Sequence, residues 1–502
     1  MKRLYTTVLK NAVANLVRGT AAAAVAIILP HFLTRTLNHE RFAGWCFLLQ
    51  IAAYASYLDF GVQTAVARYL ARYTELGEVD RRNALVSTAL GVLTLAAVVG
   101  LMALGAVLWF LPVLFRSIPA GLLPEIRIAG AILGGATILS LPFSTFSGVL
   151  IGLHRNEYVA GALAFSRLAG AAGVLLLSHR TDSLVALSAC LACANVLGSV
   201  AQVFIANRLT TLESSVFRVE TSMAIQLGRY CLGLSVWSAG MLLISGLDIA
   251  IVGHVNFNSV GYYSVAATLV ALFSGAHGAV SSALMTPVAA LHATGELERI
   301  RKLILRATSI STFINLLAIT VTFMGGKFLL VLWVGEPYAS QALPIFRILM
   351  IANGIRLVMN PYASALIATD LQRRAIAQGG VEGLVNLAFS LLGAYWIGPT
   401  GVALGTLIGA IFGLAWTCVL TVKRTTEISL GRRNFITDGI VRPFLCTLPL
   451  IVSSAAMHDR TLTVSSLGLL VASGVATYIL TYHFGNVLPR SVQLSKLFPQ
   501  AG

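Results

Sequence analysis

Long apolar runs, separated by short polar stretches, recur along the whole of this chain. Each run holds about 20 residues, the length that an α-helix needs to cross ~30 Å of hydrocarbon. The strict alternation of apolar and polar positions that is typical of membrane β-strands does not occur. The pattern therefore predicts an all-α polytopic membrane protein with about fourteen transmembrane helices. We expect them near residues 12–33, 43–64, 85–110, 126–150, 159–179, 184–206, 229–252, 261–286, 306–325, 341–367, 379–398, 401–422, 440–457 and 463–485.

Composition agrees with a membrane protein. Of 502 residues, 57% are hydrophobic and 11% are charged, a balance that a soluble fold of this length does not bury. The net charge of +16 is typical of nucleic-acid-binding proteins, but the basic residues lie in short loops between spans, so no nucleic-acid partner is expected. The six cysteines fall in apolar stretches, and neither a metal site nor a disulfide framework is predicted.

The distribution of Lys and Arg predicts the orientation. With the N-terminus inside, most of the 35 basic residues fall in segments on the inner side and few on the outer side. Cytoplasmic loops of membrane proteins carry this excess. We therefore expect an even number of spans, with both termini cytoplasmic in a plasma membrane.

An internal repeat organises the chain. Gly77-Glu78 recurs at Gly295-Glu296, 218 residues later, and similar echoes occur at offsets of 217 and 216 residues. Six spans per repeat predict two pseudo-symmetric six-helix bundles, related by a two-fold axis along the membrane normal. The predicted parts are an N-lobe (1–206), a cytoplasmic linker (207–228), a C-lobe (229–424), and a C-terminal helix pair with a tail (425–502). Within the linker, Phe217, Met223, Ile225 and Leu227 form either an amphipathic interface segment or a plain connection.

Segments outside the spans are too short for a soluble catalytic domain, and no nucleotide-binding Gly-rich loop is present. We therefore expect a transporter rather than an enzyme, without a cofactor and driven by H⁺ or Na⁺.

Ionisable residues within the spans are the candidate functional groups, because each costs at least ~2.5–3.5 kcal/mol in hydrocarbon. Arg356 is central, with Asn353 and Asn360 one turn away on either side, and Pro361 marks a kink. An ion pair that only stabilises the fold is the alternative for Arg356. Arginine outnumbers acids at this depth, which favours a cavity for an anionic, phosphate-bearing substrate. The predicted substrate-binding residues are Arg18, Arg167, Arg347, Arg356, Asn353 and Asn360. Snorkelling to the membrane surface is the alternative for Arg18 and Arg347, and a close helix contact is the alternative for Arg167. The predicted ion-coupling residues are Asp248, Asp59, His277 and Glu382, and a purely structural role is the alternative for each. Asp248 aligns with His31 in the repeat.

Several short motifs resemble one family. They are Leu58-Asp59-Phe60-Gly61 with Ala67-Arg68, Pro142 with Gly148-x-x-x-Gly152 and Arg155, Asp248 with Gly261-Tyr262-Tyr263, Thr294-Gly295-Glu296, and Trp333-Val334-Gly335-x-x-Tyr338. Over about residues 1–424 the chain resembles the repeat-unit flippases of bacterial O-antigen and exopolysaccharide synthesis. These belong to the multidrug/oligosaccharidyl-lipid/polysaccharide exporter superfamily.

The resemblance implies two bundles in a V, alternating access, a cationic lumen, and an undecaprenyl-pyrophosphate-linked oligosaccharide as cargo in the bacterial inner membrane. It also implies membrane lipid as a partner, and polymerase and chain-length proteins of polysaccharide assembly as candidate partners. Three alternatives stay open. The extra helix pair points to a lipid II flippase, and the superfamily also includes drug/cation antiporters, which need an acid-rich cavity. A membrane polysaccharide polymerase or ligase needs a long outward loop, and the outward loops here are short.

Overall fold

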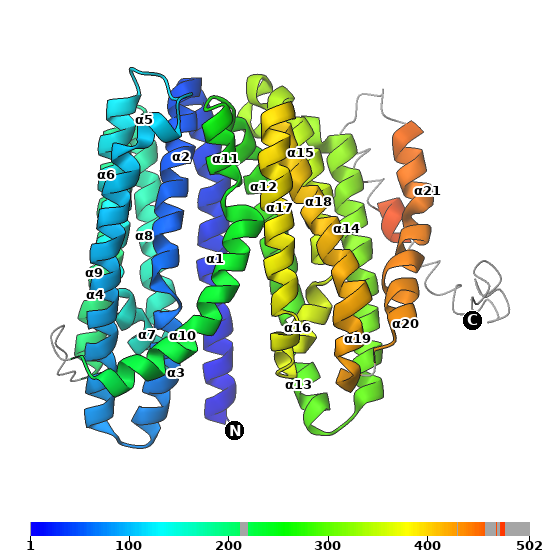
Figure 1. Ribbon diagram of the computed structural model, residues 1–502, viewed down its shortest axis with the longest axis horizontal. Helices are drawn as coiled ribbons and strands as arrows, with labels where there is room; N and C mark the ends of the chain where they lie inside the picture. Colours follow the sequence, from blue (N-terminus) through cyan, green and yellow to red (C-terminus); the bar gives the residue numbers. More distant parts are fainter. Residues whose placement is uncertain (1, 211–218, 429, 457–467, 469–471, 477–502) are drawn as a thin grey trace. The chain divides into compact units, whose positions relative to one another are not determined.

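The computed structural model describes residues 2–210, 219–428, 430–456, 468 and 472–476, and the part it describes is helical throughout (Figure 1). The chain divides into two compact units. Unit 1 comprises Met1–Thr268, Val331–Ile345 and Gly383–Thr406. Unit 2 comprises Leu269–Leu330, Phe346–Glu382 and Leu407–Gly502.

The first half of the sequence forms helices α1 to α9, and the seventh span follows as α10, a π-helical turn and α11. Their bounds are α1 (Lys2–Thr36), α2 (His39–Ser56), α3 (Val62–Glu75), α4 (Val79–Trp109), α5 (Leu111–Leu114), α6 (Leu123–Leu139), α7 (Ser144–Gly152), α8 (Asn156–Ser178), α9 (Leu184–Leu209), α10 (Thr221–Met241), η2 (Leu242–Gly246) and α11 (Asp248–Val255).

The remaining helices begin after α11. Their bounds are α12 (Ser259–Ser282), α13 (Met285–Ala293), α14 (Leu297–Val334), α15 (Glu336–Leu357), α16 (Asn360–Ala368), α17 (Ile376–Ile397), α18 (Pro399–Trp416), α19 (Val422–Arg424), α20 (Arg432–Ile436) and α21 (Arg442–Ala456).

The prediction of an all-α polytopic protein is confirmed. Twelve helical segments in the described residues are long and apolar enough to cross a membrane, and each overlaps one of the first twelve predicted spans. The thirteenth predicted span overlaps α21, which at 15 residues is shorter than those twelve. Most of the fourteenth lies outside the described residues. The predicted lobe boundaries stay predictions.

The internal repeat is visible in the local backbone. Spans two and eight are each broken into two helices, as are spans four and ten, so the breaks recur six spans apart. Gly77 and Gly295 both have positive φ, of 70° and 72°. Each ends its helix in a Schellman turn, because the next amide donates back to Tyr73 O and Leu291 O respectively, over 2.9 Å in both cases.

A second pair of turns follows the same spacing. His154 and Asp370, 216 residues apart, have φ of 60° and 58°, the left-handed region that few side chains adopt. In both turns the following amide donates back along the chain, from Arg155 to Leu150 O and from Leu371 to Leu366 O. Two matched pairs of turns at the offsets of the sequence echoes support a duplicated ancestor.

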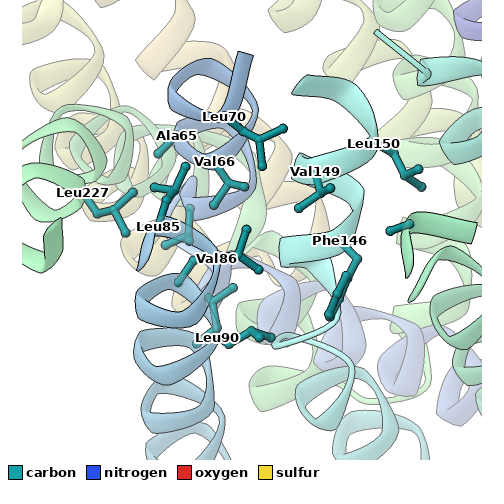
Figure 2. Close-up of a cluster of buried hydrophobic side chains, with 14 of the residues drawn as sticks. Ala65, Val66, Leu70, Leu85, Val86, Leu90, Phe146, Val149, Leu150 and Leu227 are labelled. Carbon is teal, nitrogen blue, oxygen red and sulfur yellow. The ribbon is translucent and has the colours of Figure 1, made fainter. Parts of the chain in front are cut away.

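Three of the four apolar residues singled out in the predicted linker lie in α10. Met223 and Leu227 are 4% and 2% exposed and belong to a buried cluster with residues of α3, α4 and α7 (Figure 2). Ile225 is 55% exposed, and Phe217 lies outside the described residues. In Figure 1, α10 runs obliquely to the other helices of unit 1. The seventh span thus begins as an amphipathic helix packed into the core of the first half.

Within unit 1, a set of contacts that we call the seam joins the first half of the sequence to the second. His31 of α1 contacts Trp333 O through Nδ1 over 2.5 Å, and the Trp333 indole donates to Ile27 O over 2.7 Å. The His39 ring stacks on Tyr262 at 4.4 Å. Ser117 donates to Gly253 O over 2.8 Å. The predicted topology places the seam at the outer side of the membrane.

Candidate functional site

The seventh span is interrupted towards its C-terminal end. The π-helical turn η2 and Leu247 separate α10 from α11, so carbonyls that a continuous helix would bond need other partners. Gln50 Nε2 and the Tyr54 hydroxyl, both of α2, donate to Gly246 O, with 3.0 Å for Gln50. Asn386 of α17 donates to Ile244 O. The break is therefore held by polar side chains from two other helices.

Asp248 is the first residue of α11, directly after this break, and is 6% exposed. One carboxylate oxygen, Oδ2, accepts from the Tyr263 hydroxyl over 2.8 Å and from Thr406 Oγ1 over 3.2 Å. A hydroxyl can turn its lone pairs toward a cation as readily as it donates its proton to a carboxylate. The surroundings of Asp248 are therefore compatible with its binding either a proton or a cation.

Hydrogen bonds extend from Thr406 to a second group of oxygens. The Thr406 and Ser390 hydroxyl oxygens each lie 3.2 Å from Val402 O, and Ser390 Oγ also lies 2.8 Å from Asn386 Oδ1. Each hydroxyl has one proton, so Thr406 donates either to Asp248 or to Val402 O, and Ser390 either to Asn386 or to Val402 O. Helices α17 and α18 approach closely here, because a Cβ on Gly405 would overlap Ser390. We call Asp248, Asn386, Ser390, Val402 O and Thr406 the Asp248 cluster. It offers carboxylate, amide, hydroxyl and carbonyl oxygens, the ligands that hard cations prefer.

In unit 2 the structure brings together two residues for which the sequence predicted different roles. Arg356 of α15 donates from Nε to Glu382 Oε1 of α17 over 2.7 Å. Its Nη1 lies 3.4 Å from Asn353 Oδ1, while Nη2 is buried without an acceptor. The side chains are 17% exposed for Arg356 and 3% for Glu382. This arrangement matches the ion-pair alternative for Arg356 and leaves part of its guanidinium unused.

His277 lies in a separate hydrogen-bonded chain of unit 2. Its Nε2 is 2.8 Å from Ser311 Oγ, and Ser311 donates to Leu357 O over 3.0 Å. Because the Ser311 proton is committed to that carbonyl, His277 donates from Nε2, and Nδ1 is left as the acceptor for Ser281 at 3.4 Å. This chain satisfies the Leu357 carbonyl at the end of α15.

Arg18 of α1 and Arg167 of α8 lie on two helices that pack together, and their like charges interact. In the described part of the chain neither guanidinium forms a hydrogen bond or pairs with a carboxylate. Between the same two helices, Asn156 donates to Asn15 Oδ1 over 3.3 Å. These two cations, unpaired among the described residues, give this part of the α1–α8 pair a positive charge.

The other predicted residues lie apart from these groups. Arg347 donates to Phe323 O over 2.6 Å and covers the Phe323 ring, so it is used within unit 2. Asn360 begins α16. Asp59 accepts from Ser144 over 2.8 Å and from the amides of Gly61 and Gln63, and thereby caps the start of α3. Among the described residues no group of three or more His, Cys, Asp or Glu is placed to hold a metal ion.

Comparison with solved structures then relates this geometry to a known fold. The structure of the lipid II flippase MurJ in an inward closed conformation is similar with a TM-score of 0.71 and 12% identity, over 95% of this chain and 99% of that chain. The chain has the MurJ and MATE fold. An inward-facing multidrug resistance MATE family transporter of the MOP superfamily is similar at 0.62, with 13% identity over 83% and 96% of the two chains. A mutant of the MATE transporter VcmN of Vibrio cholerae is similar at 0.54, with 16% identity over 85% and 99%.

Sequence comparison is less informative. No family model matches the chain. The uncharacterized membrane protein EpsK of Bacillus subtilis (strain 168) is 22% identical over 454 residues, which cover 86% of each chain. This relative agrees with a membrane protein and leaves the cargo open.

Proposed function

We propose that this protein is a flippase that moves undecaprenyl-pyrophosphate-linked oligosaccharide repeat units across the bacterial inner membrane by alternating access. The observation that carries the proposal is the pair of guanidinium groups, Arg18 and Arg167, which lie on packed helices and have no carboxylate partner among the described residues. The fold of a lipid flippase supports it. On this proposal both termini are cytoplasmic, and polymerase and chain-length proteins of polysaccharide assembly act on the cargo after release.

A pyrophosphate headgroup suits this pair chemically. Like charges held close together in a low-dielectric layer repel each other, and an anion between them converts the repulsion into attraction. Each guanidinium offers a planar fork of N–H donors that fits two phosphate oxygens, and a pyrophosphate has enough oxygens for two forks. A drug cation gains nothing here, which is why we rank a drug/cation antiporter lower.

The test is headgroup flipping in proteoliposomes loaded with a fluorescent undecaprenyl-pyrophosphate oligosaccharide. Arg18→Gln and Arg167→Gln should each reduce flipping about tenfold or more, because each removes one fork and so weakens charge-assisted bonding by roughly 1.5–3 kcal/mol. The matched control is Arg208→Gln, since Arg208 is exposed and covers the Phe204 ring of its own helix. Wild-type flipping in both variants would reject the proposed site, and no flipping of any pyrophosphate lipid by the parent protein would reject the function.

Lipid II is the second candidate cargo, favoured by the likeness to MurJ over nearly the whole chain. It shares the undecaprenyl pyrophosphate and differs in the glycan. Flipping rates for lipid II and for an oligosaccharide repeat unit, measured side by side, decide between them.

The proposed drive is an ion gradient coupled through the Asp248 cluster. Asp248 is the one carboxylate among its five members, and the other four supply neutral oxygens. One carboxylate grouped with neutral oxygens suits one monovalent ion, Na⁺ or H⁺, better than a divalent metal. The cluster also connects α11 to α17 and α18, so binding of the ion bears on how these helices sit beside the break in the seventh span.

A further inference from the structure

We infer that Glu382 is a resident counter-ion, which holds Arg356 while the carrier is empty and yields it to a phosphate of the cargo during transport. The inference rests on the proposed function, because it assumes an anionic, phosphate-bearing cargo. It assigns Arg356 as a second phosphate contact and Glu382 as the group that competes for it.

The way in which Arg356 is bonded motivates this inference. A guanidinium paired with a carboxylate frequently meets it with two parallel N–H bonds. Here Glu382 accepts a hydrogen bond from Nε alone. Asn353 Oδ1 lies at the long distance of 3.4 Å from Nη1, and Nη2 is buried with no acceptor. An unsatisfied buried donor is uncommon and calls for an explanation. A phosphate, with several oxygens, satisfies all three nitrogens.

The exposures of the two side chains indicate which one meets the cargo. Glu382 is 3% exposed, whereas Arg356 is 17% exposed. A ligand can therefore approach the arginine while the carboxylate stays behind it. Removing the partner of a buried charge is strongly unfavourable, so an empty carrier needs a substitute anion on Arg356 before it can return. Glu382 supplies that anion, and exchange for a phosphate leaves the arginine paired at every stage.

The packing of Glu382 provides a way to move its carboxylate without removing its charge. Gly413 of α18 faces Glu382 so closely that a Cβ there would lie 2.7 Å from Glu382 Cδ and overlap Oε2. Gly413→Ala therefore pushes the carboxylate away from its present position. Gly379, on α17 shortly before Glu382, has room for a Cβ, with no neighbouring atom within 4 Å of it, and Gly379→Ala is the matched control.

The experiment measures binding and flipping with the same full-length variants. Farnesyl pyrophosphate is titrated into purified protein in nanodiscs, and flipping is measured in proteoliposomes. Glu382→Gln and Gly413→Ala should lower the Kd about tenfold, because the competing anion is removed or displaced, and should slow multiple-turnover flipping, because the empty carrier returns with an unpaired arginine. Gly379→Ala should change neither quantity. Glu382→Gln combined with Arg356→Gln should bind no more tightly than Arg356→Gln alone.

Two results would overturn the inference. One is a Kd that rises or stays unchanged in both Glu382→Gln and Gly413→Ala, which is the behaviour of a pair that only stabilises the fold. The other is tighter binding that survives Arg356→Gln. Where a variant fails to fold, Glu382→Asp, which keeps the charge and shortens its reach, is measured in its place and should bind more tightly as well. Binding that depends on Arg18 and Arg167 but ignores Glu382 rejects this inference alone, whereas absence of farnesyl pyrophosphate binding and of flipping rejects the proposed function.

Discussion

Asp248→Asn separates the coupling role of the Asp248 cluster from its contribution to stability. Asparagine has nearly the same shape as aspartate and keeps an oxygen for the Tyr263 and Thr406 hydroxyls, which lie at 2.8 and 3.2 Å. A hydrogen bond to a charged group contributes about 1.5–3 kcal/mol and a neutral one about 1 kcal/mol. The substitution should therefore cost roughly 2 kcal/mol in total, which a folded membrane protein survives.

The effect on coupling should be larger and of a different kind. A tenfold gradient of one coupled monovalent ion is about 1.4 kcal/mol and drives up to about tenfold accumulation of cargo. The assay compares flipping into proteoliposomes with and without a tenfold Na⁺ gradient, or a gradient of one pH unit, at a clamped membrane potential. The parent protein should respond to one of the two gradients, and Asp248→Asn to neither, while farnesyl pyrophosphate binding is retained.

The control is Asp80→Asn, which removes a carboxylate from the exposed first turn of α4. A response in Asp248→Asn equal to that of the parent would show that the ion binds elsewhere. His277 would then be the next candidate, because its Nδ1 is an acceptor that a proton can occupy.

Three further predictions concern packing and the seam. Gly148→Ala should lower the thermal midpoint of unfolding and cost about 1–3 kcal/mol, because a Cβ there would lie 2.7 Å from a backbone oxygen of α3. Gly161→Ala, which has open space around it, should leave the midpoint unchanged, and circular dichroism melts compare the two variants. Leu227→Ala should cost about 2–5 kcal/mol, since Leu227 is 2% exposed in the core in Figure 2, and limited proteolysis should then cut α10 first. Trp333→Phe removes the indole hydrogen bond across the seam, which is worth about 1 kcal/mol. Labelling of the buried Cys46 by an impermeant maleimide should then rise about fivefold. Unchanged labelling, or labelling only from the inner side, would contradict the predicted topology of the seam.

The sequence was sufficient for the helices and for the matched turns of the predicted repeat, because both depend on local patterns. Apolar length determines a span wherever water is excluded, so all twelve candidate segments overlap predicted ones. The glycines of the echoed turns mark positions of positive φ, as at Gly77 and Gly295. The breaks were harder to predict: Pro361 was the one kink that we predicted, although Pro142 lies in the break between α6 and α7, and η2 contains no proline.

The candidate site was predicted less completely, for a physical reason. Charged residues stand out in an apolar span, so Asp248, Arg356 and Glu382 were singled out from the sequence as candidates. Ser390 and Thr406 were missed, because a hydroxyl within a span usually bonds a carbonyl of its own helix and then gives no functional signal. Asn386, four residues before Ser390, was the available signal. That Arg356 meets Glu382 depends on how α15 and α17 pack, and neither helix records this in its own pattern.

The π-helical turn η2 determines the rotational phase of α11, and it does so through its length and not through any one side chain. A π turn holds more residues than an α turn, so Leu242–Gly246 shifts the rotational phase of everything that follows. Loss of a single residue from this stretch would restore an ordinary helix and rotate α11 by about 100°. Asp248 would then point away from Thr406, although every residue of the Asp248 cluster was still present. The Asp248 cluster therefore depends on the number of residues in η2 as well as on their identity.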